Sequence, residues 1–135
     1  MSRTQDIEKA VAQVLQRPDL NGVYRLSLSG VGDEARLDGR CMVDKRALLT
    51  SVSQALDFPD YFGKNWDALE ECLGDMHWRE GPIWLVIEHA NAIPQGLLDT
   101  FLEIFADQAA AWTDAERACS LFLCDLENPE IPLLA

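Results

Sequence analysis

Four carboxylates follow one another through a short stretch of the chain, and their types and spacing could do chemistry. They are Asp67, Glu70, Glu71 and Asp75. At about 100° per residue, these side chains share one side of a helix and the apolar residues from Trp66 to Met76 share the other. Like charges one helical turn apart, as at Glu71 and Asp75, cost about 0.2–0.5 kcal/mol in an isolated helix. A sequence that tolerates this cost suggests that the acidic face has a use.

Three interpretations of this face stay open from the residues alone. The first is a solvated surface, on which Asp67 is favoured by the helix macrodipole. The second is a catalytic or Mg²⁺-binding site with His77 as a base, although carboxylates on the outer face of one helix diverge instead of converging in a cleft. The third is a docking face for a basic protein, because each carboxylate can accept two hydrogen bonds from an arginine. No G-x-S-x-G, phosphate-binding loop or H-E-x-x-H motif supports the second.

The loop before the acidic stretch is expected to be rigid and to set where the helix begins. Pro59 lacks an N–H and biases Phe58 away from helical angles, so no helix can run through this point. Gly63 offers a backbone position that is open to positive φ. Asn65 is a candidate N-cap, since its side-chain oxygen can accept a hydrogen bond from an N–H two or three residues later. We therefore expect a helix over about 66–75.

Elsewhere, helical patterns alternate with buried strands, which is typical of an α/β fold with a small, mostly parallel sheet. Amphipathic periodicity predicts helices over about 4–17, 45–56 and 95–112. Apolar or alternating runs predict strands over 23–28, 83–87 and 118–124. A further short strand over 35–37 could pair back on the first strand before a turn at Asp38-Gly39.

Single residues are expected to set some of these boundaries. Thr4 and Asp44 are placed to cap the first two helices, and Pro18 to end the first. Asn21-Gly22 signals a turn. Large aromatic side chains are expected in the core, and these are Trp66, Trp84, Phe101 and Trp112. Tyr61 could pack in the core with only its hydroxyl exposed, or lie on a contact loop.

Length and composition favour one domain over residues 1–135, with an N-terminal helical extension over 1–20 and a C-terminal tail over 125–135. A hydrophobic content of 48% is enough for a core. The formal charge of −12 disfavours direct binding of nucleic acid, because phosphate binding needs clustered Lys and Arg, and it favours a basic protein partner.

The cysteines and the apolar runs bear on the compartment. The four cysteines form no CxxC pair, so we expect reduced thiols and neither a disulfide framework nor a zinc site. No signal peptide or membrane-spanning run is visible, which favours a cytoplasmic location without membrane association.

The stretch from Tyr61 to Leu73, which reads Y-F-G-K-N-W-D-A-L-E-E-C-L, closely resembles the signature of the barstar family. These are small intracellular proteins that inhibit ribonucleases. The resemblance extends from about Leu37 to Cys124 and is strongest over 56–73. It implies the family fold, a small three-stranded, mainly parallel sheet packed with helices. It also implies that a loop and the helix after it occlude the active-site cleft of a basic ribonuclease, which requires no chemistry.

The resemblance also implies where the partner would bind. The candidate residues are Tyr61, Gly63, Asn65, Asp67, Glu70, Glu71, Asp75 and Asp107. By motif match, the first three fall on the family's contact loop. Asp67 and Glu71 fall on its two principal acidic contacts, and Asp107 aligns with a further acidic contact on the long helix.

Two residues depart from the type member of the family: Glu70 stands where it has a tryptophan, and Lys64 replaces an acidic residue. These departures bear on the identity of the partner. We expect a non-enzymatic inhibitor of a basic ribonuclease of extracellular or toxin type. It would need no cofactor or metal, bind no nucleic acid directly and be a monomer when free. The alternative is an immunity or adaptor protein whose basic partner is not a ribonuclease, and a hydrolase using Asp67, Glu71 and His77 comes third.

Overall fold

The computed structural model describes residues 3–27 and 36–135, which form an α/β fold. The helices are α1 (Arg3–Leu15), α2 (Lys45–Ala55), α3 (Trp66–Asp75) and α4 (Gln95–Asp114). The strands are β1 (Gly22–Leu26), β2 (Arg36–Asp38), β3 (Ile83–Glu88) and β4 (Cys119–Cys124). Short 3-10 helices are η1 (Pro18–Leu20), η2 (Gly39–Cys41) and η3 (Ala90–Ala92). The predicted fold class is confirmed, and so are the extra N-terminal helix and the extra short strand.

The sheet has the strand order β1-β4-β3-β2, and every neighbouring pair is parallel. The prediction that the short strand pairs back on β1 is wrong, because β2 pairs with β3 at the opposite edge, with Leu37 opposite Ile87. Two contacts explain why β2 lies beside β3. Leu37 packs against the larger of two hydrophobic clusters, which lies under α3 and α4 and which we call the main core. The Nε atom of Arg36 lies 2.8 Å from a carboxylate oxygen of Glu88 on β3. Glu88 thus helps to hold the edge strand β2 against β3.

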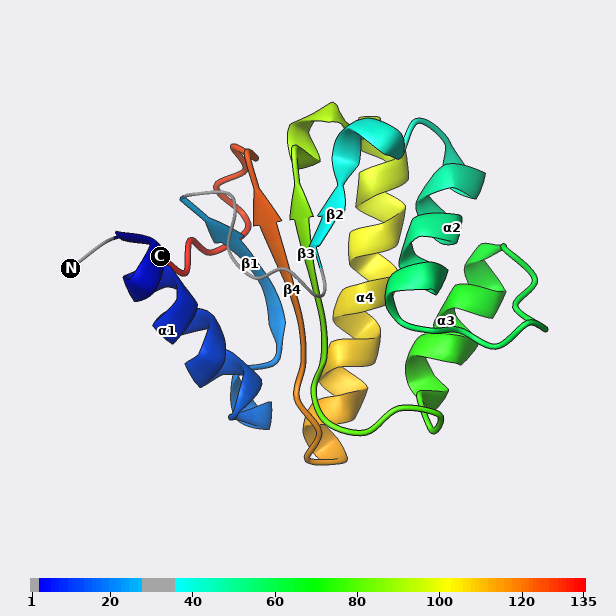
Figure 1. Cartoon of the computed structure of the whole chain (residues 1–135), viewed down its shortest axis with the longest axis horizontal. Coiled ribbons are helices and arrows are strands. Elements are labelled where there is room, and N and C mark those ends of the chain that lie inside the picture. Colours follow the sequence, from blue (N-terminus) through cyan, green and yellow to red (C-terminus); the bar gives the residue numbers. More distant parts are fainter. Residues whose placement is uncertain (1–2, 28–35) are drawn as a thin grey trace.

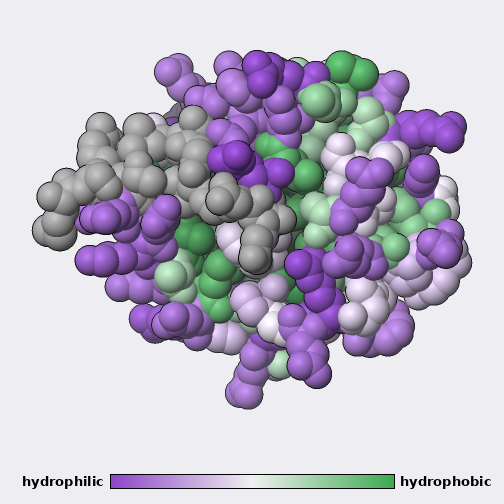
Figure 2. All heavy atoms as spheres, viewed as in Figure 1, coloured by the Kyte–Doolittle hydropathy of each residue, from purple (hydrophilic) through white to green (hydrophobic). Residues whose placement is uncertain are grey.

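The sheet is buried on both faces (Figure 1), with α2, α3 and α4 on one side and α1 on the other. Successive side chains of β4 point to opposite faces of the sheet and so contribute to both cores. Leu121 and Leu123 belong to the main core under α3 and α4, and Phe122 belongs to the second cluster, under α1. Every residue of β4 is buried, as its continuous apolar run predicted. Figure 2 shows polar side chains over most of one face of the molecule, with apolar residues visible in patches between them.

The N-terminal elements differ from the prediction in their boundaries. Because α1 begins at Arg3, Thr4 lies inside its first turn instead of at the N-cap. Asn21 and Gly22 do not form an isolated turn, since Gly22 is the first residue of β1. The side chain of Asn21 donates a hydrogen bond of 2.8 Å to the carbonyl of Arg117 and accepts one of 2.8 Å from the N–H of Cys119. It thereby ties β1 to β4.

The predicted cap of α2 is confirmed, because the N–H of Ala47 donates a hydrogen bond of 2.8 Å to the Asp44 carboxylate. The last residues of the chain, 125–135, are not a free tail, since they run along the outer edge of β1. The N–H of Arg25 donates to the carbonyl of Pro132, and the N–H of Leu134 donates to the carbonyl of Arg25, each over 2.8 Å. An edge covered in this way cannot pair with another chain.

Across the described parts of the chain, no helix is both long enough and apolar enough to cross a membrane.

Candidate partner-binding site

Helix α3 has the bounds and the cap that its sequence predicts. The side-chain oxygen of Asn65 accepts a hydrogen bond of 2.7 Å from the N–H of Ala68, which satisfies one of the free donors at the helix start. Leu69 and Leu73 are fully buried against the main core. Burial of this stripe turns the opposite face outward, so the acidic residues of α3 are all exposed: Asp67, Glu70, Glu71 and Asp75.

Aromatic rings packed edge to face anchor the loop before α3. Phe58 packs edge-on against Phe62 and Trp78, with ring centroids 5.0 and 5.9 Å apart. The indole Nε1 of Trp78 in turn donates a hydrogen bond of 3.0 Å to the carbonyl of Leu56. With Phe62 turned inward, its neighbour Tyr61 points into solvent and keeps 71% of its surface exposed. Of the two placements considered for Tyr61, the structure has the exposed one.

The positive φ expected at Gly63 belongs instead to Lys64, whose φ is 51°. At Gly63 the constraint is one of space, because a β-carbon there would lie 3.3 Å from the Nδ2 atom of Asn65, a tight contact that would press on the capping side chain. The left-handed turn at Lys64 then delivers Asn65 in the extended conformation (φ −133°) that an N-cap residue adopts.

Glu71 lies at the centre of the acidic face, because it borders two hollows. One, of about 220 Å³, is lined by Tyr61, Phe62, Ala68, Glu71, Cys72 and Asp75; we call it the loop-side hollow. The other, of about 460 Å³, is lined by Asp67, Glu70, Glu71, Gly74 and Gln108; we call it the α4-side hollow. The structure thus brings Tyr61 and the four acidic residues of α3 together around one carboxylate.

Asp107 is exposed on α4 but lines neither hollow. The next residue, Gln108, lines the α4-side hollow in its place. A β-carbon at Gly74 would lie 2.8 Å from the Oε1 atom of Gln108, so a larger residue at this position would displace the Gln108 side chain from its place in the hollow. No local sequence pattern marks Gln108 as a site residue, because only the packing of the two helices brings it to the site.

The C-terminal end of α3 is held from outside the helix. The indole of Trp112 on α4 donates a hydrogen bond of 2.7 Å to the carbonyl of Leu73. The guanidinium of Arg117 donates to the carbonyls of Met76, Arg79 and Gly81 over 3.0, 2.6 and 2.9 Å. It also lies 5.1 Å from the ring centre of Trp112. These contacts satisfy carbonyls that the helix end and the following turn leave free, and the sequence patterns did not reveal them.

The groups that could serve catalysis are poorly placed for it. Burial, with the nearby charges of Asp75 and Glu71, raises the pKa of the Cys72 thiol, so this residue is not a ready nucleophile. The Nδ1 atom of His77 lies 2.7 Å from the Asp75 carboxylate, and its ring is exposed to solvent. Among the described residues, no three His, Cys, Asp or Glu side chains are grouped so that they could hold a metal ion.

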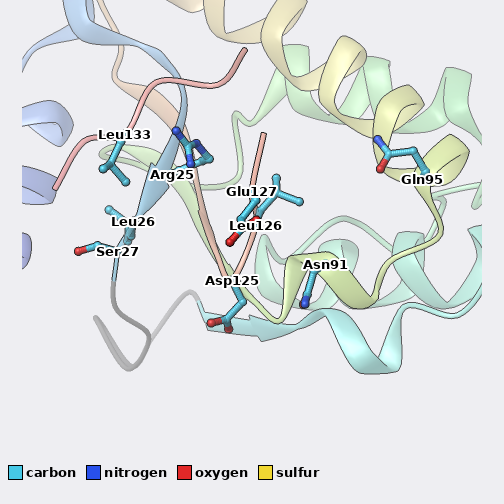
Figure 3. A pocket seen from close by; sticks show the side chains of 9 residues that line it. All are labelled: Arg25, Leu26, Ser27, Asn91, Gln95, Asp125, Leu126, Glu127 and Leu133. Carbon is cyan, nitrogen blue, oxygen red and sulfur yellow. The ribbon is translucent and has the colours of Figure 1, made fainter. Parts of the chain in front are cut away.

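A larger, open hollow of about 730 Å³ lies at the carboxyl ends of β1 and β4 (Figure 3). Ligands of parallel sheets often bind at this edge. Two of the three charged residues that line it, Arg25 and Asp125, however, already serve the fold. The Nε atom of Arg25 donates a hydrogen bond of 2.8 Å to the carbonyl of Ile131, and the Asp125 carboxylate accepts one of 3.1 Å from the N–H of His89. No residue of α3 or of its preceding loop lines this hollow.

Comparison with known proteins places this site in a family. The family model of barstar, described as barnase inhibitor, matches residues 33–124. The chain belongs to the barstar family. The match includes α2, α3, α4 and strands β2 to β4, and therefore the whole acidic face; α1 and β1 lie outside it. The resemblance seen in the sequence is confirmed.

A relative of this chain comes from Bacillus subtilis (strain 168) and is named "Putative ribonuclease inhibitor YrdF". It is 37% identical to this chain over 71 residues, which cover 53% of this chain and 70% of the relative.

Proposed function

We propose that this barstar-family chain inhibits a basic ribonuclease of extracellular or toxin type, and that the acidic face of α3 and the loop before it lie across the active-site cleft of the enzyme. One observation carries the proposal. Glu71 borders both hollows, and Asp67, Glu70 and Glu71 form no ion pair among the described residues. Their charges are therefore available to a partner.

The physics of ribonucleases makes such a face suitable. A cleft that holds RNA must be positive, because it binds and stabilises phosphate oxygens. Carboxylates present a similar charge, and each can accept two hydrogen bonds from an arginine. A unit charge pair 4 Å apart gains about 4 kcal/mol at an effective dielectric constant of 20, before the cost of desolvation. Occlusion of this kind requires no bond to be made or broken, so we propose that the chain is not an enzyme.

The name of the B. subtilis relative supports this class of partner. The cysteines fit a cytoplasmic location, since Cys41 is exposed, Cys72, Cys119 and Cys124 are buried, and none of the four is in a disulfide. We further propose that the free chain is a monomer, that its partner-binding face carries no cofactor, and that it binds no nucleic acid directly.

An inhibition assay tests the proposal. The purified chain is titrated into a panel of basic microbial ribonucleases that includes barnase, and the initial rate of RNA hydrolysis is measured. We expect inhibition of at least one enzyme at one-to-one stoichiometry. Glu71→Gln should weaken it, whereas Asp6→Asn, the same loss of charge at an exposed position of α1, should not. If the wild-type chain inhibits none of them, the proposal is wrong.

A second candidate is an immunity or adaptor protein whose basic partner is not a ribonuclease. The charge of Glu70, in the α4-side hollow where the type member of the family has an aromatic side chain, favours a different partner surface. This candidate predicts that the chain forms a complex with a basic protein and that Glu71→Gln weakens the complex. The partner would either not hydrolyse RNA or hydrolyse it at the same rate in the complex.

A further inference from the structure

A small surface of the opposite charge adjoins the acidic face. A hollow of about 340 Å³ is lined by Arg46, Phe62, Gly63 and Lys64, and we call it the basic notch. Phe62 also lines the loop-side hollow, which contains Glu71 and Asp75. The sign of the surface charge therefore reverses across the width of one aromatic side chain.

The two cations of the basic notch are not neutralised within the fold. Arg46 and Lys64 are exposed, and neither forms an ion pair among the described residues. No carboxylate lines the notch. The chain has 23 Asp and Glu against 11 Lys and Arg, so acidic partners are abundant in its sequence. Arg46 and Lys64 share one hollow, and no acidic residue pairs with either of them among the described residues. This arrangement indicates that the two cations have a use outside the fold.

Each cation also occupies a position that disfavours it. Lys64 has a φ of 51°, in the left-handed region where a β-carbon is unfavourable and Gly or Asn is usual. Arg46 lies in the first turn of α2, where the macrodipole opposes positive charge, although the N-cap carboxylate of Asp44 offsets part of this effect. Residues kept at a cost to stability are characteristic of binding sites.

We propose that the basic notch receives a carboxylate side chain of the protein partner, and that this contact fixes the partner's orientation and selects among basic proteins. The proposal rests on the proposed function for the class of partner. A uniformly positive surface docked on α3 would bring like charges together at Arg46 and Lys64, which is unfavourable. A partner that has a carboxylate beside its basic cleft would instead be attracted at both places.

Charge-reversal variants test the proposal, because the basic notch and the net charge of the chain predict opposite changes in affinity. The probe is the ribonuclease that the wild-type chain inhibits most strongly in the panel above. Lys64→Glu and Arg46→Glu make the chain more acidic, so simple attraction to a basic enzyme predicts tighter binding. The basic notch predicts the opposite, a dissociation constant that rises roughly 10-fold or more for each variant.

Lys45→Glu is the matched control, because it makes the same charge change on the neighbouring exposed residue of α2, which does not line the basic notch. It should bind as tightly as the wild type or slightly more tightly. Lys64→Asn removes the charge with a residue that tolerates the left-handed backbone, and it should also weaken binding. This neutral variant keeps the test decisive if Lys64→Glu does not fold. Replacement of the matching carboxylate in the enzyme by lysine should restore binding of Lys64→Glu.

The outcomes separate the two proposals. If Lys64→Glu, Arg46→Glu and Lys64→Asn bind as tightly as the wild type or more tightly, the basic notch is not a contact, while inhibition through α3 stands. If the wild type inhibits no ribonuclease, both proposals fail. If the wild type binds a labelled single-stranded RNA oligonucleotide, and the notch variants lose that binding, the notch takes a phosphate and the proposal of a partner's carboxylate is wrong.

Discussion

The indole nitrogen of Trp112 on α4 donates a hydrogen bond of 2.7 Å to the carbonyl oxygen of Leu73, in the last turn of α3. Arg117, beyond the end of α4, binds the carbonyl of Met76 just after that turn. The acidic face therefore depends on α4 for its position, and the cap at Asn65 fixes only its other end.

Trp112→Phe should loosen α3 without changing its charges. The variant loses the hydrogen bond to Leu73 and leaves a buried carbonyl without this donor, which costs about 1–3 kcal/mol of unfolding free energy. Hydrogen exchange should become faster at the amides of the last turn of α3. Trp84→Phe, the same change on the α1 side of the sheet, should leave exchange in α3 unchanged. Equal exchange in α3 of wild type and Trp112→Phe would show that the bond does not position the helix.

Glu71→Ala should affect stability and binding in opposite directions. Removing a charge from the crowded acidic face should leave the unfolding free energy unchanged or raise it by up to about 0.5 kcal/mol. Binding of the ribonuclease should weaken by at least ~2 kcal/mol, because a cation in its cleft would lose its partner. Thermal denaturation and titration calorimetry measure the two quantities, with Glu8→Ala on α1 as the control. A loss of stability with unchanged affinity would make Glu71 a structural residue.

Lys64→Asn should stabilise the free chain, because asparagine adopts the left-handed backbone more readily than lysine. We expect a gain in unfolding free energy of roughly 0.5 kcal/mol. Lys45→Asn makes the same replacement at the helical first residue of α2, where no left-handed strain is relieved; the lower helix propensity of asparagine and the loss of a positive charge at the helix N-terminus oppose each other, so little change is expected. Chemical denaturation of both variants measures this. If Lys64→Asn were less stable than the wild type, the positive φ would not be a source of strain.

The cysteines should differ sharply in reactivity. Cys41 is exposed, whereas burial raises the pKa of Cys119 and Cys124 to about 12 from an ordinary value of 9.0. An alkylating reagent at pH 8 should therefore modify one thiol per native chain quickly and the rest only after unfolding, as mass spectrometry can count. Because the folded chain holds these two protons more tightly, stability should also fall as the pH rises above about 9. Rapid native modification of Cys119 would contradict the buried strand.

Association with the ribonuclease should be slowed by salt. The exposed carboxylates of α3 attract a basic cleft over distances comparable to the Debye length, which shortens from about 30 Å at 0.01 M to about 3 Å at 1 M ionic strength. Stopped-flow measurements should show an association rate that falls about 10-fold or more over this range, with a much smaller change in dissociation rate. A rate independent of salt would mean that the acidic face does not guide encounter.

The sequence predicted local features of the site well and distant ones poorly. The bounds of α3 and the cap at Asn65 follow from signals within a few residues, and both are correct. The predicted partner of β2 was wrong, because a strand of three residues carries no information about which strand it will join. The propensity of glycine favoured a positive φ at Gly63, but Lys64 adopts it, and a β-carbon at Gly63 would be in tight contact with the side chain of Asn65.

Residues that reach the site from other elements had no local signal. Gln108 and Trp112 follow the ordinary pattern of α4, and their contacts with α3 arise only when the two helices pack together. The acidic and basic hollows that meet at Phe62 likewise combine residues of α2, the loop and α3.

Competition with a mononucleotide tests the central claim, that the acidic face occupies the active-site cleft, most directly. The ribonuclease that the chain inhibits is saturated with a mononucleotide bound in its active site, and the affinity of the chain is measured by titration calorimetry. If the face lies in the cleft, the apparent dissociation constant rises in proportion to nucleotide concentration, and Asp6→Asn behaves in the same way. An affinity that is independent of the nucleotide, with a stable ternary complex, would contradict it.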